Sequence, residues 1–367
     1  MTDRKVLGSR LSALRALCRR KRAGAILLTD RHHVRYFSGF TGEDSFLLAG
    51  RRWVRLLTDG RFTEQARIEC PHVKAIRRDG RMLDAIAAAL AGRRVRALAV
   101  EGNAMTVTLR AELQRALPRV RIKPLSGEVA ALREVKDAVE LASIRKAVRS
   151  AERGFAELLA AGRKRFVGRT ETEVAAELEY RMRLHGAEGA AFETIVAAGA
   201  HAAMPHYRPG AARIRPGDFV LIDWGAVVGG YCSDLTRVVF TGRIPPRIAR
   251  IYEVVLRAQS AGVRALRPGA TCGDADAAAR DVIAEAGHAE AFAHGLGHGL
   301  GLEVHESPRL GRGVKQALAA GMVVTVEPGI YLPGTGGVRI EDDVLVVPGG
   351  RRRLSRLPRD LQAMVLK

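Results

Sequence analysis

The chain has 367 residues, a hydrophobic fraction of 47% and a formal net charge of +21. This length exceeds one average domain and allows a large core, so we expect two folded domains and exclude a disordered chain. The 4 cysteines are scattered without a CxxC pair, which argues against a zinc ribbon or a disulfide framework and is typical of a cytoplasmic protein. No apolar run reaches transmembrane length, so we expect no membrane partner.

The first segment predicts an amphipathic helix. Leu7, Leu11, Leu14 and Leu17 recur at helical spacing and form one apolar stripe. The segment lacks the continuous apolar core of a secretory signal. An arginine-rich transit peptide is the alternative, and we prefer a helix of the folded protein.

The excess of basic residues is spread along the whole sequence. It permits contact with nucleic acid or an anionic surface. However, no aromatic residues are interleaved with the basic ones, and no RNA-binding signature is present. We therefore expect the charge to solvate the surface generally and expect no nucleic-acid partner.

Residues 1–126 alternate short apolar runs with helical stretches. Strands alternating with helices predict a layered α/β domain. The pattern contains no independent chemistry, so we expect this half to shape the mouth of a site elsewhere. The predicted strands are 25–28, 46–49, 54–57, 98–100 and 120–122, and the predicted helices are 61–70, 82–90 and 106–117.

The sequence changes character near Pro124 to Glu128, so we place the second domain at residues 127–367. A long helix is predicted over 134–161. Thr170 and Glu173 form a capping-box pattern at the start of the next helix. Further helices over 248–266 and 272–287 would cover antiparallel strands, which predicts an α+β domain.

The first predicted hairpin of this domain brings two carboxylates close together. Residues 219–222 and 235–240 are strand-like, and Gly229-Gly230 between them is a two-residue turn signal. In that register Gly225 lies opposite Asp234, and Asp223 lies on the same face as Asp234. Because an unpaired buried carboxylate is costly, Asp223 should have a partner.

A second predicted hairpin places two more carboxylates opposite each other. Strands over 322–332 and 337–347 would flank a loop centred on Gly334, which places Glu327 directly opposite Glu341. Like charges in that arrangement repel, and a bound cation reverses the sign of the interaction. A slip of one residue in either hairpin would remove this argument.

His298 completes a set of four carboxylates and one imidazole: Asp223, Asp234, His298, Glu327 and Glu341. Oxygen and nitrogen ligands of this kind suit a pair of divalent ions such as manganese, cobalt, iron or zinc. Taken singly, each residue is better explained as a turn, cap, loop or solvated strand residue. Their order and their positions on paired strands favour the metal site.

The segments DWGAVVGGYCSDLTR, HGLGHGLGLEVHE, EPGIY and RIED resemble the metallopeptidases of the pita-bread fold. The likeness is to the branch of Xaa-Pro aminopeptidases and Xaa-Pro dipeptidases, or prolidases, within family M24. YFSGFTG and TDGRF are similar to the N-terminal domain of that branch, so the resemblance covers essentially the whole chain. It implies a pita-bread catalytic domain preceded by a smaller creatinase-type α/β domain.

The resemblance implies hydrolysis of the peptide bond preceding proline by a hydroxide held between two metal ions, with manganese expected first. Asp223 would bind one ion, Asp234 and Glu341 both, and His298 and Glu327 the second. Glu327 would also move the proton. His206 and His305 would act in catalysis and contact the substrate. His294 and Arg339 are expected to bind substrate. We expect a homodimer or a higher homo-oligomer.

Other functions remain open. Methionine aminopeptidase shares the ligand scheme, but the N-terminal domain and the SDLTR segment argue against it. Creatinase shares the architecture without the metal ligands, which are complete here. From another class, the chain would be a non-peptidase pita-bread protein that binds nucleic acid or a protein partner. The choice between aminopeptidase and dipeptidase is left open by the sequence.

Overall fold

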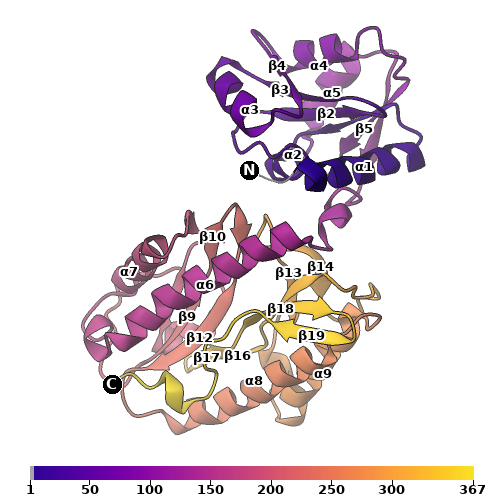
Figure 1. Ribbon diagram of the computed structural model, residues 1–367. Helices are drawn as coiled ribbons and strands as arrows, with labels where there is room; N and C mark the ends of the chain where they lie inside the picture. The colour runs from indigo at the N-terminus through magenta and orange to yellow at the C-terminus, as the bar shows by residue number, and fades with distance from the viewer. Residues whose placement is uncertain (1–3) are drawn as a thin grey trace. The chain divides into compact units, whose positions relative to one another are not determined.

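The computed structural model describes residues 4–367, which form two compact units (Figure 1). The first unit ends at Arg133 and the second runs from Glu134 to Lys367. The division therefore falls after Arg133, whereas the sequence placed it after residue 126. A 3-10 helix over Ala130–Arg133 belongs to the first unit, where the Tyr36 hydroxyl donates to the carbonyl of Leu132 at 3.0 Å.

The first unit is a six-stranded sheet in the order β4-β3-β2-β1-β5-β6 with five α-helices. The β1–β5, β5–β6 and β3–β4 pairs are parallel, and β2 is antiparallel to both of its neighbours. The strands are β1 (Ala25–Leu28), β2 (Phe46–Gly50), β3 (Val54–Thr58), β4 (Lys74–Arg77), β5 (Ala97–Glu101) and β6 (Arg121–Leu125). The helices are α1 (Arg4–Arg20), α2 (Arg31–Ser38), α3 (Thr63–Glu69), α4 (Met82–Leu90) and α5 (Val107–Ala116).

Helix α1 confirms the predicted amphipathic segment. Leu7, Leu11, Leu14 and Leu17 are all buried, because residues at this spacing share one face of a helix. The stripe therefore belongs to the folded first unit.

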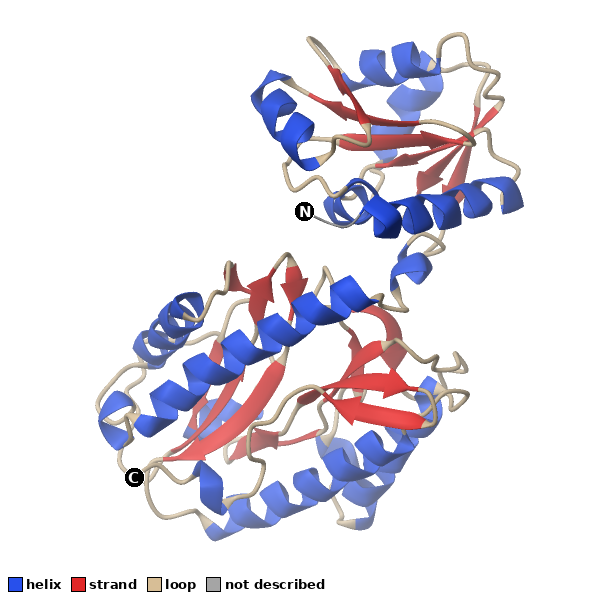
Figure 2. Ribbon diagram, in the orientation of Figure 1, coloured by secondary structure: helices blue, strands red, loops and turns tan. Residues whose placement is uncertain are grey.

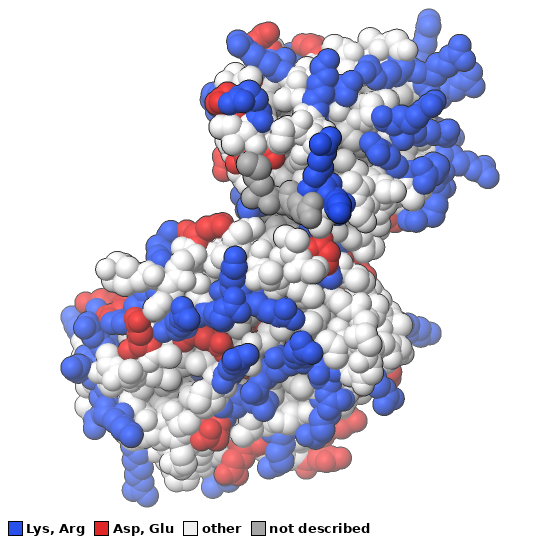
Figure 3. Space-filling view, in the orientation of Figure 1, with Lys and Arg blue, Asp and Glu red and all other residues white. Residues whose placement is uncertain are grey.

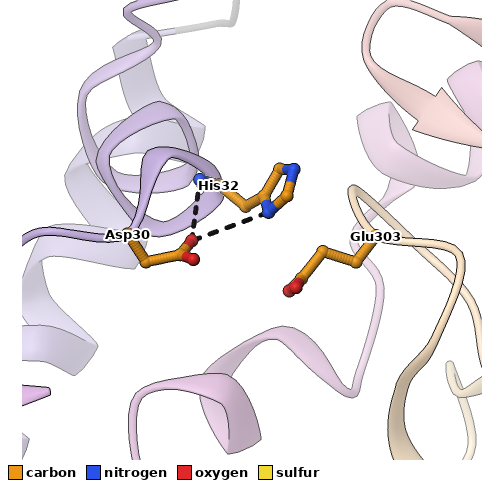
Figure 4. A group of neighbouring side chains, drawn as sticks. All are labelled: Asp30, His32 and Glu303. Atoms are coloured by element: carbon orange, nitrogen blue, oxygen red, sulfur yellow. Dashed lines mark hydrogen bonds and ion pairs between the residues drawn. The ribbon is translucent and has the colours of Figure 1, made fainter. Parts of the chain in front are cut away.

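Polar groups gather where β1 and β5 end. Asp30 caps α2 by accepting a hydrogen bond from the main-chain nitrogen of His32 (Figure 4). It accepts a second one from the main-chain nitrogen of His33. The buried Glu101, the last residue of β5, accepts from the main-chain nitrogen of Asp30 at 3.0 Å and contacts the ring of His33. A carboxylate from one strand thus fixes the turn that follows its parallel neighbour.

The second unit encloses one large core between two helix pairs and several small antiparallel sheets. Figure 2 shows the α6–α7 pair and the α8–α9 pair on different sides of the strands. The helices are α6 (Ala138–Ala160), α7 (Glu171–Leu184), α8 (Pro246–Ala265) and α9 (Cys272–Glu285). The strands are β7 (Gly189–Ala190), β8 (Ile195–Ala198), β9 (Phe219–Trp224), β10 (Ala226–Val228), β11 (Tyr231–Cys232), β12 (Leu235–Phe240), β13 (Gly297–Gly299), β14 (Glu306–Leu310), β15 (Val323–Val326), β16 (Gly329–Leu332), β17 (Gly336–Arg339), β18 (Asp342–Val347) and β19 (Gly350–Arg353).

Helix α6 begins at Ala138 and not at the predicted residue 134. Asp137 is its N-cap and forms a capping box with Glu140. The residues before it are extended, because Val135 bridges Met322 and the nitrogen of Lys136 donates to the carbonyl of Gly321. The capping box predicted for Thr170 and Glu173 is confirmed at the start of α7.

Within the described residues, no helix combines the length and the apolar character that a membrane crossing requires. The four cysteines are buried free thiols.

A buried ion pair joins β12 to β18. The Arg237 guanidinium donates to Asp342 Oδ1 at 2.8 Å, and both side chains are fully buried. The same guanidinium also donates to the carbonyls of Glu341 at 2.6 Å and Pro358 at 2.9 Å. Arg237 therefore satisfies a charge and several main-chain oxygens that water does not reach.

We expect Arg237→Met to destabilise the second unit by about 3 kcal/mol, because removing one partner leaves a buried charge without compensation. The chain has 2 tryptophans, Trp53 in the first unit and Trp224 in the second. In a Trp53→Phe background, denaturant unfolding followed by Trp224 fluorescence measures this loss.

The matched control is Arg351→Met in the same background, because Arg351 is exposed on β19. Its effect should stay within about 0.5 kcal/mol. Equal unfolding midpoints for the two variants would show that the buried pair contributes nothing special to stability.

Candidate metal centre

The first predicted hairpin has the predicted register. In the β9–β12 pair, Asp223 lies opposite Thr236 and Trp224 opposite Leu235. One step further, Gly225 lies opposite Asp234, as the sequence indicated. The turn at Gly229 and Gly230 is also confirmed, with φ of 62° and 77° in the left-handed region that favours glycine.

The second hairpin also keeps its predicted register but is not continuous. Gly329 pairs with Arg339 in the β16–β17 sheet, and Val326 pairs with Asp342 in the β15–β18 pair. The prediction of two unbroken strands was therefore wrong. Both strands leave the ladder at Glu327 and Glu341, which face each other across the interruption. The break separates two sheets at the carboxylates that the sequence singled out.

Thr236 connects the two hairpins. Thr236 and Glu341 form an isolated antiparallel bridge, in which the nitrogen of Glu341 donates to the Thr236 carbonyl at 3.2 Å. The Thr236 hydroxyl donates to Glu341 Oε2 at 2.6 Å. Because Thr236 also lies opposite Asp223, carboxylates from both hairpins meet beside this residue.

Two glycines allow the main chain to pass closely at this site. A Cβ atom on Gly225 would lie 2.0 Å from the carbonyl oxygen of Ser233. A Cβ atom on Gly297 would lie 2.2 Å from the carbonyl oxygen of Thr325. No other residue fits at either position without moving the backbone.

The tightest group of potential metal ligands is Asp234, His298 and Glu341. Each offers one donor atom, and these three atoms lie within 4.8 Å of one another. His298 Nε2 lies 3.6 Å from Asp234 Oδ2 and 3.2 Å from Glu327 Oε1. The Nδ1 atom of His298 lies 3.0 Å from the carbonyl of Gly299. A hydrogen bond from Nδ1–H there orients the ring so that Nε2 faces the carboxylates, where it can serve as the ligand atom when an ion binds.

Asp223 of β9 is connected to this group of potential ligands through Arg339. The Arg339 guanidinium donates from Nη2 to Asp223 Oδ2 at 2.5 Å and from Nε to the Thr236 hydroxyl at 3.0 Å. The other oxygen, Asp223 Oδ1, is buried, and among the described residues it has no hydrogen-bond partner. Glu341 Oε1 is likewise buried and has no hydrogen-bond partner among the described residues. No hydrogen bond therefore offsets the burial of these two carboxylate oxygens.

Burial and mutual repulsion act on these carboxylates. Burial raises the pKa of Asp234 well above its usual value, and the neighbouring Glu341 and Asp223 raise it further. Burial, followed by Glu327 and Asp223, does the same for the pKa of Glu341. Burial would also raise the pKa of Glu327, but the hydrogen bond and the charge of His298 bring it down to about 2. Carboxyl groups that resist being ionised at the same time need a nearby positive charge, which a metal ion provides.

The remaining predicted histidines surround this group. The ring of His305 lies 4.4 Å from the ring of His298 in an edge-on arrangement. Although His305 is exposed, partial desolvation of its ring lowers its pKa, and the nearby His298 and His206 lower it further. Both His206 and His305 are exposed. His294 instead uses its ring nitrogens within the protein, with Nε2 2.9 Å from the Tyr331 hydroxyl.

Tyr331 and Asp343 belong to this site, and the sequence analysis missed them. The Tyr331 hydroxyl accepts from Arg339 at 2.8 Å and so links His294 to Arg339. Asp343 Oδ2 accepts from the main-chain nitrogen of Asp234 at 3.1 Å. The signal was present, because both residues stand in the motifs EPGIY and RIEDD.

Glu171 was also missed, although it stands inside the predicted capping-box segment. It is fully buried and accepts hydrogen bonds from the Tyr207 hydroxyl at 2.7 Å and the main-chain nitrogens of Ala198 and Gly210. Its Oε1 also lies 2.8 Å from His201 Nδ1. These contacts hold both ends of the loop that carries His206. Its position as the first residue of α7 gave no indication of this role.

The donor set fits a metal ion of the kind that oxygen and imidazole ligands select. Carboxylate oxygens without partners, a histidine with its free nitrogen turned inward and a buried cluster of negative charge are complementary to a divalent cation. Without a cation, this arrangement would only cost free energy.

Two family models match the chain. Residues 142–348 match the model of metallopeptidase family M24, and residues 10–135 match the model of the creatinase/prolidase N-terminal domain. Together the two models span both units of the structure.

Named relatives agree with these models. The structure of an Xaa-Pro dipeptidase from Bacillus anthracis is similar, with a TM-score of 0.93, 36% sequence identity and coverage of 98% of this chain and 100% of that one. The structure of an X-Pro aminopeptidase from Thermotoga maritima MSB8 has a TM-score of 0.90 and 36% identity, covering 97% and 99%. An Xaa-Pro dipeptidase of Pyrococcus furiosus is 43% identical over 239 residues, which is 65% of this chain and 68% of the relative.

The expected fold and the expected enzyme class are thereby confirmed. The creatinase-type domain precedes a pita-bread domain of mixed helices and strands, and that second domain contains the carboxylate cluster. The chain belongs to metallopeptidase family M24 and has a creatinase/prolidase N-terminal domain.

Proposed function

We propose that this metallopeptidase is an exopeptidase that hydrolyses the peptide bond preceding proline, using two divalent metal ions. The observation that supports this most directly is the buried cluster around His298, in which Asp223 Oδ1 and Glu341 Oε1 have no partner within the described residues. The similar proteins named Xaa-Pro dipeptidase and X-Pro aminopeptidase support the choice of substrate.

The ligands are divided between two ions in this proposal. Asp223 would hold one ion, His298 and Glu327 would hold the other, and Asp234 and Glu341 would contribute to both. Manganese is the ion we expect first, with cobalt, zinc and iron as alternatives for the same donors. Arg339 holds Asp223 Oδ2 and leaves Oδ1 for the ion.

Bound divalent ions of this kind supply a hydroxide nucleophile at neutral pH and polarise the peptide carbonyl. Glu327 Oε1, 3.2 Å from His298 Nε2, takes a proton as the nucleophile forms and passes it to the leaving nitrogen of proline. Without metal, burial opposes the ionisation of Glu327, but His298 outweighs it and lowers the pKa of this carboxyl to about 2, so the group is a carboxylate that can bind a cation.

His206 and His305 act where charge develops. Both imidazoles are exposed, and the ring of His305 lies against His298. We assign them to the tetrahedral intermediate and the leaving nitrogen, which hydrogen-bond donors stabilise. The roles of His294 and Arg339 in substrate binding stay predictions, because the structure shows both side chains engaged with Tyr331.

The alternative is a pita-bread protein without peptidase activity that binds nucleic acid or a protein partner. The complete donor set favours the enzyme, because a binding protein has no need of a buried carboxylate cluster that costs free energy without a cation.

Hydrolysis of Ala-Pro and Ala-Pro-Ala by metal-depleted protein, with manganese, cobalt or zinc added back, tests the substrate class. We expect cleavage only with metal. Cleavage of the dipeptide alone would identify a dipeptidase, and release of Ala from the tripeptide an aminopeptidase. No cleavage of either peptide with any ion would contradict the proposal.

Asp234→Asn should lower kcat/KM by at least about 100-fold, since the loss of a supporting group near a metal already costs 10–100-fold. The metal-free variant should unfold at a higher temperature than metal-free wild type, because it lacks one of the repelling carboxylates. Added manganese should stabilise it less than wild type. Calorimetry with and without manganese measures both effects.

The matched control is Asp281→Asn on the exposed surface of α9. It should change neither activity nor the stabilisation by manganese. If Asp234→Asn kept wild-type turnover, the dinuclear site would have to be abandoned.

His305→Ala should lower kcat by about 100-fold, the effect of removing one donor to a developing oxyanion. Its metal content, measured by atomic absorption, should equal that of wild type, because His305 is not a ligand in this proposal. His185→Ala, a C-cap residue of α7, should retain wild-type kcat. Loss of metal from His305→Ala would make His305 a ligand instead.

A further inference from the structure

Four basic segments of the first unit are distant in sequence but meet at one edge of its sheet. They are residues 19–22, 51–52, 93–96 and 119–123, and they contain no acidic residue. Ala25 of β1 pairs with Gly50 of β2 and with Leu98 of β5, and Ala97 pairs with Arg121 of β6. The amino ends of β1, β5 and β6 and the turn after β2 therefore lie side by side. We call these four segments the basic edge.

Hydrogen bonds join three of these segments, and a ring contact lies beside the fourth. The Lys123 ammonium donates to the carbonyl of Lys21 at 2.9 Å, and the nitrogen of Arg121 donates to the carbonyl of Arg96 at 3.0 Å. The Arg93 guanidinium lies 4.7 Å from the ring centre of Trp53, beside the turn at 51–52. The fold thus concentrates charge that the sequence shows only as dispersed.

Most arginines of the basic edge have no acidic partner. Among the described residues, no ion pair joins any arginine of these segments to a carboxylate, and only Lys21 pairs with an acid, Glu128. Elsewhere in the first unit several arginines are paired with acids, for example Arg67 with Glu64 and Arg77 with Asp79. Figure 3 shows the result as a region of Lys and Arg with few acidic residues on the right-hand side of this unit.

The basic edge also includes a groove. The groove, of about 500 Å³, lies along the outer strand β6 and is lined by the basic residues Lys21, Arg121 and Lys123 and the apolar residues Ile122, Pro124 and Leu125. Charges of one sign around a groove focus the electrostatic potential and raise the local concentration of a polyanion.

We propose that the basic edge binds the phosphodiester backbone of nucleic acid without reading its sequence. Arginine predominates there, and its planar guanidinium binds phosphate through two parallel hydrogen bonds. A lipid surface fits less well, because membrane-surface binders present large apolar side chains for insertion. In the first unit, the exposed large hydrophobic residues among those described are Ile68 and Val107, which lie outside the basic edge.

This proposal is independent of the peptidase activity. The basic edge lies at the amino ends of β1, β5 and β6, and none of its residues belongs to the carboxylate cluster of the second unit. It departs from the expectation that the excess charge only solvates the surface and that nucleic acid is not a partner.

Binding of the full-length protein to a fluorescein-labelled 20-base-pair DNA duplex, measured by anisotropy between 50 and 300 mM NaCl, tests it. We expect log Kobs to fall linearly with log[NaCl], with a slope of roughly −0.9 for each phosphate neutralised. A variant with six substitutions to Gln should raise Kd by at least tenfold at 100 mM NaCl and make the slope shallower. The substituted residues are Arg19, Arg20, Arg94, Arg96, Arg119 and Arg121, all exposed.

The control removes the same charge from exposed positions of the second unit. Its six arginines, also changed to Gln, are Arg247, Arg250, Arg257, Arg264, Arg351 and Arg352. The control should bind DNA within about twofold of wild type, and both variants should keep wild-type peptidase activity and melting temperature.

Three results would overturn the proposal. If both sets of six substitutions weakened DNA binding equally, only the net charge of the protein would matter. Binding to phosphatidylglycerol vesicles but not to DNA would assign the basic edge to a lipid surface. No binding to the duplex at 50 mM NaCl would leave the basic edge without this partner.

Discussion

Repulsion among buried carboxylates is the constraint on which the second unit depends. Asp234 and Glu341 are buried next to each other and to Asp223, and burial and repulsion both oppose their ionisation. The fold meets this cost with fixed partners on one side of the cluster: Arg339 holds Asp223, and Thr236 donates to Glu341. The oxygens left without partners define the side on which a cation is needed.

The rest of the unit holds these groups in place. The bridge between Thr236 and Glu341 connects the two hairpins, and the buried pair of Arg237 and Asp342 connects the same strands one residue further on. His298 enters from a third strand with its ring oriented by the carbonyl of Gly299. Each donor therefore lies within a strand or directly beside the end of one, so the neighbouring ladders hold the geometry before any ion binds.

Much of the arrangement of the carboxylates was predictable from the sequence, because the position of a turn determines which residues of a hairpin lie opposite each other. The pairs Gly225 with Asp234 and Glu327 with Glu341 follow from the turn positions alone, and the structure keeps both registers. The apolar stripe of α1 and the capping box of α7 are local patterns of the same kind. The interruption of the second hairpin was missed, because nothing in the alternation shows that the two halves of a strand join different sheets.

What the sequence could not show depends on contacts between distant residues. Glu171 looks like an ordinary helix-start residue, and only the fold brings Tyr207 and the nitrogen of Gly210 to its carboxylate. The basic edge is hidden in the same way, since Lys123 and Lys21 meet only after the sheet has formed. The helix expected from residue 134 begins at Ala138, because the preceding residues pair with the segment around Met322.

The close approach of the main chain at Gly225 and Gly297 has an evolutionary consequence. The spacing of the strands is set there by backbone against backbone, with the carbonyls of Ser233 and Thr325 where side chains would be. Substituting a ligand therefore changes the chemistry of the site while the distances between its positions stay the same. The scaffold can be inherited separately from its catalysis, and a descendant that exchanged its donors would still present five side chains to one point.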